Sequence, residues 1–372
     1  MKIAIIRQRY NPYGGAERFV SRALSALSQQ HGVSLHLIAR KWEPINGIQF
    51  HACNPIYLGR LTRDLGFALS ACKTAEKLGV DLIQSHERLQ CCDIYRAGDG
   101  VHREWLAQRS RQLNRFASFL LQANPYHLYL KLIERRMFEG KRLRAVICNS
   151  HMVKNEILSY FQIDKHKIHV IPNGIDTQTF HPKLKQQRNQ LRQEWNIPAD
   201  VPVYLFVGSG YQRKGLKLTL QAFAMQQQGY LLVVGHDKHE QFYRAVAKQL
   251  NIQERVLFLG SQQDVKPFYG LSDVFVLPTL YDPFSNAVLE AMACGLPVIT
   301  SLKSGAAEIV KNDVNGFVCD ALDIQQLASS MQKLGNRQLA NGMGLEARIS
   351  AENYDWSIIG DKLTHLYQSL GV

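Results

Sequence analysis

The sequence predicts an α/β protein with two domains, each built on a parallel sheet with crossover helices. Short apolar runs, several of them β-branched, alternate with helical patterns along the whole chain, and this alternation is typical of parallel sheets. A chain of 372 residues is long for one hydrophobic core. A polar, Gln-rich segment also separates two sets of candidate strands, so we expect two domains of ordinary size.

We expect the first domain over residues 1–172 and the second over residues 173–353, with a C-terminal helix over 354–372 that packs back on the first. The first set of candidate strands is Lys2–Arg7, Ser34–Ala39, Ile48–Ala52, Asp81–Gln84, Asp93–Arg96, Ala145–Cys148 and Ile168–Ile171. The second set is Val203–Val207, Leu231–Val234, Val256–Leu259, Val274–Leu277 and Val298–Thr300. The interdomain link begins at Pro172-Asn-Gly-Ile-Asp176 and runs to Pro202.

The N-terminus and the cysteines indicate a cytoplasmic protein. The apolar run before Arg7 has only four residues, which suits a strand and not a signal peptide, and no stretch resembles a membrane-spanning helix. The seven cysteines show no C-x-x-C spacing and are odd in number. We therefore expect reduced thiols and no disulfide framework.

The positive charge lies in the first half of the chain. The formal net charge is +13, and residues 1–170 carry 26 Lys and Arg against 13 Asp and Glu, whereas the remainder is balanced at 18 against 18. A positive charge confined to one half of the chain indicates an anionic partner. Acidic lipid, a phosphorylated glycan and nucleic acid are the alternatives.

Residues 103–144 concentrate this charge. They hold ten Lys and Arg against three Glu, interleaved with aromatic and aliphatic side chains from Trp105 to Phe138. Such a mixture is typical of an interfacial segment, whose cations meet lipid phosphates and whose rings lie at the headgroup level. The alternative is a solvated basic face whose apolar side packs on its own domain. We favour peripheral membrane contact.

Two loops of the first domain follow candidate strands and so fall at the carboxyl edge of the sheet, where such folds bind ligands. Gly14 and Gly15 come after the first strand, and adjacent glycines let the backbone approach a ligand or simply form a tight turn. Asp99 stands between Gly98 and Gly100. It is either a titratable group exposed in a cleft or a structural turn residue.

The second domain carries a phosphate-binding pattern. Gly208-Ser-Gly-Tyr-Gln-Arg213-Lys214-Gly215 lies between a strand and a helical pattern, and Arg213 and Lys214 would neutralise a diphosphate. The spacing matches neither the Walker motif nor the dinucleotide fingerprint.

The stretch from Tyr281 to Thr300 predicts a loop followed by a buried helix. Ser285 or Asn286 is the expected cap and Gly295 the expected stop. Every side chain from Ala287 to Cys294 is apolar except Glu290, so that carboxylate is expected inside the protein or at the floor of a cleft. Together with the glycine loop, this helix predicts a nucleotide-diphosphate site in which Glu290 accepts from a ribose diol.

No metal site is expected. There is no Asp-x-Asp and no metal-spaced His or Cys cluster, so Arg213 and Lys214 alone would meet the phosphate charge.

The motifs resemble those of the retaining family 4 glycosyltransferases. The run from Asp282 to Glu290 resembles the E-x7-E signature of that family, with Asp282 where the family usually has Glu. Further matches are Pro172–Asp176, Gly14-Gly15, Gly208 with Arg213-Lys214, and Tyr354-Asp-Trp356. Asp99 stands where many members have His, and this feature, the Tyr10–Arg18 segment and the basic insert resemble the lipopolysaccharide core glucosyltransferase I branch. The resemblance implies two Rossmann-like domains facing across a cleft, the glycosyltransferase-B fold.

The resemblance also implies a role for each matched residue. Arg213 and Lys214 would hold the donor diphosphate, Glu290 the ribose and Asp282 a hydroxyl of the donor sugar. The backbone amides of Phe284, Ser285, Asn286 and Ala287 would meet phosphate and sugar. Gly14, Gly15 and Gly208 would let backbone approach the donor, and Asp99 would face the reacting centre.

We expect a retaining, metal-independent hexosyltransferase that moves a sugar from a nucleotide sugar to a membrane-borne anionic glycan. The resemblance to the glucosyltransferase branch implies that the sugar is glucose and the donor UDP-glucose. The enzyme would lie on the inner leaflet through residues 103–144 and would not bind nucleic acid. The alternatives are another family 4 transferase using mannose or N-acetylglucosamine, a phosphorylase or epimerase on the same fold, and a non-catalytic nucleotide- or nucleic-acid-binding protein.

Overall fold

The computed structural model describes residues 1–8, 33–42 and 47–371. It forms two compact units, Met1–Asn173 with Ser357–Val372, and Gly174–Trp356. The chain passes between them at Gly174, next to the predicted boundary. A Cβ atom on Gly174 would lie 2.6 Å from the indole of Trp356, so the backbone can pass this ring only without a side chain.

The first unit is an α/β layer structure. Within the described residues its parallel sheet has seven strands in the order β3-β2-β1-β4-β5-β6-β7. The strands are β1 (Lys2–Ile6), β2 (Ser34–Ala39), β3 (Ile48–Ala52), β4 (Leu82–Ser85), β5 (Ile94–Arg96), β6 (Ala145–Cys148) and β7 (Ile168–Val170). The helices are α2 (Gly59–Leu78), α3 (His102–Ser110), α4 (Arg115–Ala123), α5 (Pro125–Phe138), α6 (His151–Tyr160), α15 (Trp356–Ser369) and the 3-10 helix η1 (Lys165–Lys167).

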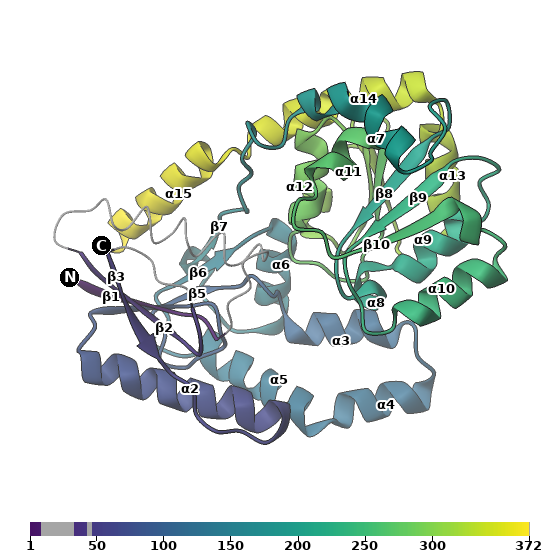
Figure 1. Ribbon diagram of the computed structural model, residues 1–372. Coiled ribbons are helices and arrows are strands. Elements are labelled where there is room, and N and C mark those ends of the chain that lie inside the picture. The colour runs from purple at the N-terminus through teal and green to yellow at the C-terminus, as the bar shows by residue number, and fades with distance from the viewer. Residues whose placement is uncertain (9–32, 43–46, 372) are drawn as a thin grey trace. The chain divides into compact units, whose positions relative to one another are not determined.

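Neighbouring side chains of a strand point to opposite faces of the sheet, and the two faces of this sheet are covered by different helices. Ile83 of β4 belongs to a core that includes Phe67 of α2, Phe138 of α5 and Ile157 of α6. Figure 1 shows α2 and α5 side by side beneath the sheet. The next residue, Gln84, accepts a buried hydrogen bond of 2.7 Å from the hydroxyl of Tyr367, so α15 packs on the first unit from the other side.

The second unit repeats this architecture. Among its described residues, a parallel sheet of six strands has the order β10-β9-β8-β11-β12-β13. The strands are β8 (Val203–Val207), β9 (Tyr230–Val234), β10 (Val256–Gly260), β11 (Val274–Leu277), β12 (Val298–Ser301) and β13 (Gly316–Cys319). The α-helices are α7 (Arg188–Glu194), α8 (Tyr211–Lys214), α9 (Leu216–Phe223), α10 (Glu240–Gln249), α11 (Lys266–Leu271), α12 (Asn286–Ala293), α13 (Ile324–Leu334) and α14 (Arg337–Glu352). The 3-10 helices are η2 (Pro182–Gln187), η3 (Gln253–Arg255) and η4 (Gly305–Ile309).

The Gln-rich segment, which we described as the interdomain link but placed within the second domain, is a folded part of the second unit. It forms η2 and α7, and Arg192 of α7 is 1% exposed. Its guanidinium donates to Asp273 at 2.7 Å and to the carbonyl oxygen of Leu271 at 3.0 Å. A buried charge with a carboxylate and several carbonyl partners ties a polar segment to the fold without apolar residues.

The expectation of seven reduced thiols was wrong. Cys72 of α2 and Cys91, which precedes β5, form a disulfide with a Cα–Cα distance of 5.9 Å. The other five cysteines are free and buried. The pairing depends on how α2 packs beside this loop, and no spacing motif marks it.

None of the described helices combines the length and the apolar content that crossing a membrane requires.

Candidate active site

The glycine loop of the second unit follows β8 and is shaped around Lys214. A Cβ atom on Gly208 would lie 3.3–3.4 Å from three carbons of the Lys214 side chain, so this glycine gives room for the lysine stem. Gly215 has a φ of +82°, and its Cβ atom would lie 2.0 Å from the carbonyl oxygen of Pro278. Only glycine suits that position.

Lys214, Arg213 and Asp282 meet in one cluster. The ammonium group of Lys214 donates to Asp282 Oδ2. Arg213 Nη1 lies 3.6 Å from the same oxygen and donates to the carbonyl oxygen of Tyr281 at 3.3 Å. The side chains of Lys214 and Asp282 are 12% and 8% exposed, whereas that of Arg213 is 40% exposed. The structure thus brings Asp282 to the adjacent pair Arg213 and Lys214, the second of which lies 68 positions earlier in the sequence.

The charges of this cluster stabilise one another. Burial would raise the pKa of the Asp282 carboxyl, but Lys214, Arg213 and the backbone N–H of Phe284 hold that pKa below its ordinary value of 3.8. The Asp282 carboxylate is therefore ionised and lies against two cations.

Two buried hydroxyls lie beside this cluster. Ser285 is the residue before α12, as predicted, but its side chain makes no capping bond. Ser304 follows β12 and pairs with Asp282 in an isolated β-bridge. Ser285 and Ser304 are 2% and 1% exposed, and within the described part of the chain neither Oγ atom has a hydrogen-bond partner.

An unpaired buried hydroxyl is unfavourable unless a ligand or water satisfies it. The first-turn N–H groups of α12 likewise lack intrahelical acceptors. The start of α12 therefore offers hydrogen-bond donors next to two cations, which is the chemistry that binds phosphate.

Glu290 is buried in α12, as predicted, and is 3% exposed. Its Oε2 atom accepts a hydrogen bond of 2.9 Å from the hydroxyl of Tyr269 in α11. Tyr269 also donates to the carbonyl oxygen of Ala287 at 3.4 Å. A protein donor thus orients the carboxylate that we assigned to ribose.

Asp99 belongs to the first unit, in the loop between β5 and α3. Its side chain is 60% exposed, and its Oδ2 atom lies 4.0 Å from Nη1 of Arg88. Gly100 has a φ of +67°, so the turn that presents Asp99 needs a glycine.

Residues 103–144 form α3, α4 and α5, and part of the apolar stripe packs inside. Leu130, Met137 and Phe138 are buried, whereas Phe116, Phe119 and Leu120 of α4 are 72%, 67% and 54% exposed. No residue of α4 is buried. The helix therefore presents an uncovered apolar face.

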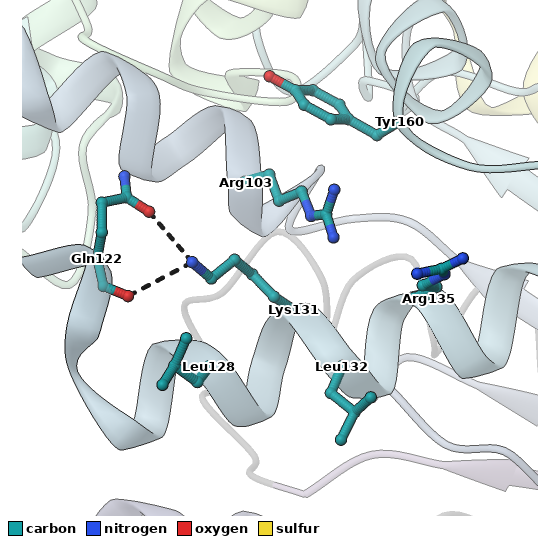
Figure 2. A pocket seen from close by; sticks show the side chains of 7 residues that line it. All are labelled: Arg103, Gln122, Leu128, Lys131, Leu132, Arg135 and Tyr160. Carbon is teal, nitrogen blue, oxygen red and sulfur yellow. Dashed lines mark hydrogen bonds between the residues drawn. The ribbon is translucent and has the colours of Figure 1, made fainter.

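An open cavity of about 520 Å³ lies beside α4. Its lining residues are Arg103, Gln122, Leu128, Lys131, Leu132, Arg135 and Tyr160. Figure 2 shows the three cations around this space, with Lys131 donating to the side-chain oxygen of Gln122 at 3.2 Å. Leu128 and Leu132 are about half exposed beside them. This surface combines cations with apolar side chains.

Other predicted positions are accounted for as follows. Gly14 and Gly15, and the Tyr10–Arg18 segment, lie outside the described residues. Phe284 is buried with its ring 6.3 Å from that of Tyr354. Asn286 and Ala287 begin α12 and are partly exposed. The sequence prediction missed Ser304 and Tyr269, and the position of Ser304 in the loop that follows a parallel strand was the signal that could have marked it.

In the parts of the chain that the structure describes, no three His, Cys, Asp or Glu side chains are grouped so that they could hold a metal ion.

Comparison with protein families accounts for both halves of the chain. Residues 13–179 match the family described as Glycosyltransferase Family 4, and residues 187–355 match the family described as Glycosyl transferases group 1.

Individual relatives are distant. The lipopolysaccharide glucosyltransferase WaaG of Escherichia coli is 23% identical over 383 residues, which cover 97% of each chain. An uncharacterised glycosyltransferase of Methanocaldococcus jannaschii, MJ1607, is 32% identical over 178 residues. The N-acetyl-alpha-D-glucosaminyl L-malate synthase of Bacillus anthracis is 30% identical over 210 residues. The matches to the last two span about half of each protein, 46% and 54% of their lengths.

Solved structures share the fold over the whole chain. The crystal structure of WaaG superposes with a TM-score of 0.85 at 21% identity and covers 98% of this chain and 99% of that one. The Anabaena protein HepE in complex with UDP-glucose superposes with a TM-score of 0.75 at 19% identity and covers 99% and 100%.

Proposed function

Because the chain is a family 4 glycosyltransferase with the glycosyltransferase-B fold, we propose that it moves a hexose from a nucleotide sugar to a membrane-borne anionic glycan. Within this proposal the donor is UDP-glucose and the acceptor is a glycan of the lipopolysaccharide-core type. The names of a full-length relative, a lipopolysaccharide glucosyltransferase, and of a structural neighbour in complex with UDP-glucose support this choice.

The observation that carries the proposal is the cluster at the start of α12. Lys214 and Arg213 would exchange Asp282 for the oxygens of the donor diphosphate, and the N–H groups of α12 with Ser285 and Ser304 would complete the phosphate site. Release from the cations would free the Asp282 carboxylate for a hydroxyl of the donor sugar. Glu290, oriented by Tyr269, would accept from the ribose.

The chemical step is proposed to retain the anomeric configuration. The leaving diphosphate would accept the proton of the attacking hydroxyl on the same face of the sugar, and Asp99 would orient or stabilise the reacting centre. Stabilisation of the departing diphosphate by Arg213 and Lys214 would be the main catalytic contribution. The proposal requires no metal, so turnover is expected to survive removal of divalent cations by EDTA.

Thermal denaturation with a panel of sugar nucleotides tests the donor, since a ligand that binds the folded protein stabilises it by mass action. UDP-glucose is expected to raise the melting temperature of wild type, and Lys214→Met to abolish that rise. Turnover of UDP-glucose with a lipid-linked glycan should then be lost in Asp99→Asn and Glu290→Gln proteins that still fold. Unchanged turnover in both variants would refute the site assignment.

The membrane contact is proposed to use the exposed face of α4 and the cavity of Figure 2, at the cytoplasmic face of the membrane. Apolar side chains beside cations bind anionic bilayers in two ways: the apolar groups are buried among the lipids, and the cations are attracted to the lipid phosphates. Several arginines of the insert already have protein partners: Arg135 pairs with Glu139 at 2.9 Å, Arg142 with Asp93 at 3.4 Å, and Arg144 donates to the carbonyl oxygen of Leu370 at 2.5 Å. The charges of these arginines are therefore partly compensated within the protein.

A sharper test removes apolar residues of α4. Sedimentation with vesicles that contain anionic phospholipid is expected to fall strongly for Phe116→Ser/Phe119→Ser and to stay unchanged for Arg142→Gln, the matched control away from α4. Equal sedimentation of both variants with wild type would contradict the membrane contact and leave the donor site untouched.

A further inference from the structure

Arg88 connects three parts of the first unit. It follows β4, and its side chain is 15% exposed. Its Nε atom donates to Glu134 Oε1 of α5 at 2.8 Å, and its Nη2 atom donates to the carbonyl oxygen of Gly100 at 3.3 Å. Its Nη1 atom lies 4.0 Å from Asp99 Oδ2. One planar guanidinium therefore contacts both α5 and the loop that carries Asp99.

Glu134 fixes this guanidinium from inside the protein. Its side chain is fully buried, and the same Oε1 atom accepts the backbone N–H of His102, the first residue of α3, at 2.9 Å. The residue before α3, Val101, has no side-chain cap. Glu134 thus does for α3 what a capping side chain does for other helices, and it holds Arg88 at the same time.

The Asp99 side chain has few contacts besides Arg88. Gly98 and Gly100 flank Asp99, and glycine gives the chain more conformational freedom than any other residue. The ends of the loop are held by Ala97 and Val101, whose side chains are buried in the core, and Asn149 Nδ2 donates to the Gly98 carbonyl oxygen at 3.5 Å, but the Asp99 side chain itself is 60% exposed. Arg88 supplies the nearest described positive charge to the Asp99 carboxylate.

We propose that Arg88, held by Glu134, is a positioning residue that sets the place and orientation of the Asp99 carboxylate for sugar transfer. This inference rests on the proposed function, in which Asp99 faces the reacting centre. Arg88 acts through Asp99 and has no contact with substrate in this assignment. Lysine cannot replace it, because an ammonium group lacks the planar fork that reaches Glu134, Gly100 and Asp99 together.

The test is a double-mutant cycle on kcat and on the KM for the sugar nucleotide. Arg88→Lys is expected to lower kcat about 100-fold, the effect of a misplacement of about 1 Å. It should leave the donor KM within about 2-fold, because no described contact joins Arg88 to a residue proposed to hold the donor. Arg88→Lys/Asp99→Asn should lose no more activity than Asp99→Asn alone, because Arg88 acts only through Asp99. Arg142→Lys is the matched control, a partly exposed arginine paired with Asp93 before β5.

The outcomes separate this inference from the proposed function. A folded Arg88→Lys protein with kcat within about 3-fold of wild type would overturn the inference, as would losses that multiply in the double variant. Wild-type kcat in Asp99→Asn alone would instead refute the role of Asp99 in the proposed function. If Arg88→Lys does not fold, Glu134→Gln takes its place in the same cycle with the same expected loss, since a neutral amide no longer fixes the guanidinium.

Discussion

Replacing Lys214 with Met tests whether the cluster in the second unit is a buried ion pair. Removing one partner of a buried pair lowers the free energy of unfolding by about 3–5 kcal/mol, because the other charge is left uncompensated. Arg213 remains 3.6 Å from Asp282, but its side chain is 40% exposed, so it compensates only in part and we expect about 3 kcal/mol. For a unit of this size, that corresponds to a fall of about 6–12 °C in melting temperature.

The assay compares Lys214→Met with Lys214→Met/Asp282→Leu by urea denaturation and differential scanning calorimetry. The double variant leaves no buried charge unpaired, so it should recover most of the lost free energy. UDP should stabilise wild type and neither variant. A loss below about 1 kcal/mol in the single variant, or a double variant no more stable than the single one, would show that Asp282 does not depend on Lys214.

Three further predictions concern the backbone, a histidine and the disulfide. Gly215→Ala should prevent stable folding of the second unit, as judged by calorimetry, whereas Gly208→Ala should fold normally and bind UDP more weakly, because it displaces only a flexible lysine stem. Burial lowers the pKa of His102 from 6.5 to about 3; the unfolded state therefore takes up a proton first as pH falls below 6.5, and stability declines by up to about 1.4 kcal/mol per pH unit. In His102→Gln, the free energy of unfolding measured by urea titration at successive pH values should depend on pH with a slope smaller by one proton. Cys72→Ser should lower stability by about 3 kcal/mol, the loop-closure term for a separation of 19 residues, only under oxidising conditions. Thiol titration of the denatured, oxidised protein should find five thiols, and seven would contradict the disulfide and agree with the cytosolic redox state.

The strands of both sheets could be predicted because each is a short apolar run with its own pattern. Ser34–Ala39, Ala145–Cys148 and Val203–Val207 have the predicted bounds, and the alternation with helices led to the two parallel sheets that the structure contains. β13 was missed, since Gly316 and Cys319 leave only two strongly apolar residues between them.

The candidate site could be predicted where a residue type conflicts with its surroundings. Glu290 in an apolar helix and Arg213-Lys214 after a glycine loop are such conflicts, and they pointed to the elements that meet in the second unit. The contact of Lys214 with Asp282, the unpaired hydroxyl of Ser304 and the bond from Tyr269 to Glu290 depend on tertiary packing, which no local pattern encodes. Arg88 and Glu134 were hidden for the same reason, being 46 residues apart.

The two sides of α5 contact different parts of the first unit. One side presents Leu132 and Arg135 to the open cavity, and the other presents Glu134 to the interior, where it holds Arg88 and the first residue of α3. Through Glu134 and Arg88, α5 thus connects the cavity on its outer side with the Gly100 carbonyl oxygen of the Asp99 loop. If an anionic surface bound at that cavity displaced α5, thermodynamic linkage would require the Asp99 loop to alter the affinity for that surface by the same free energy.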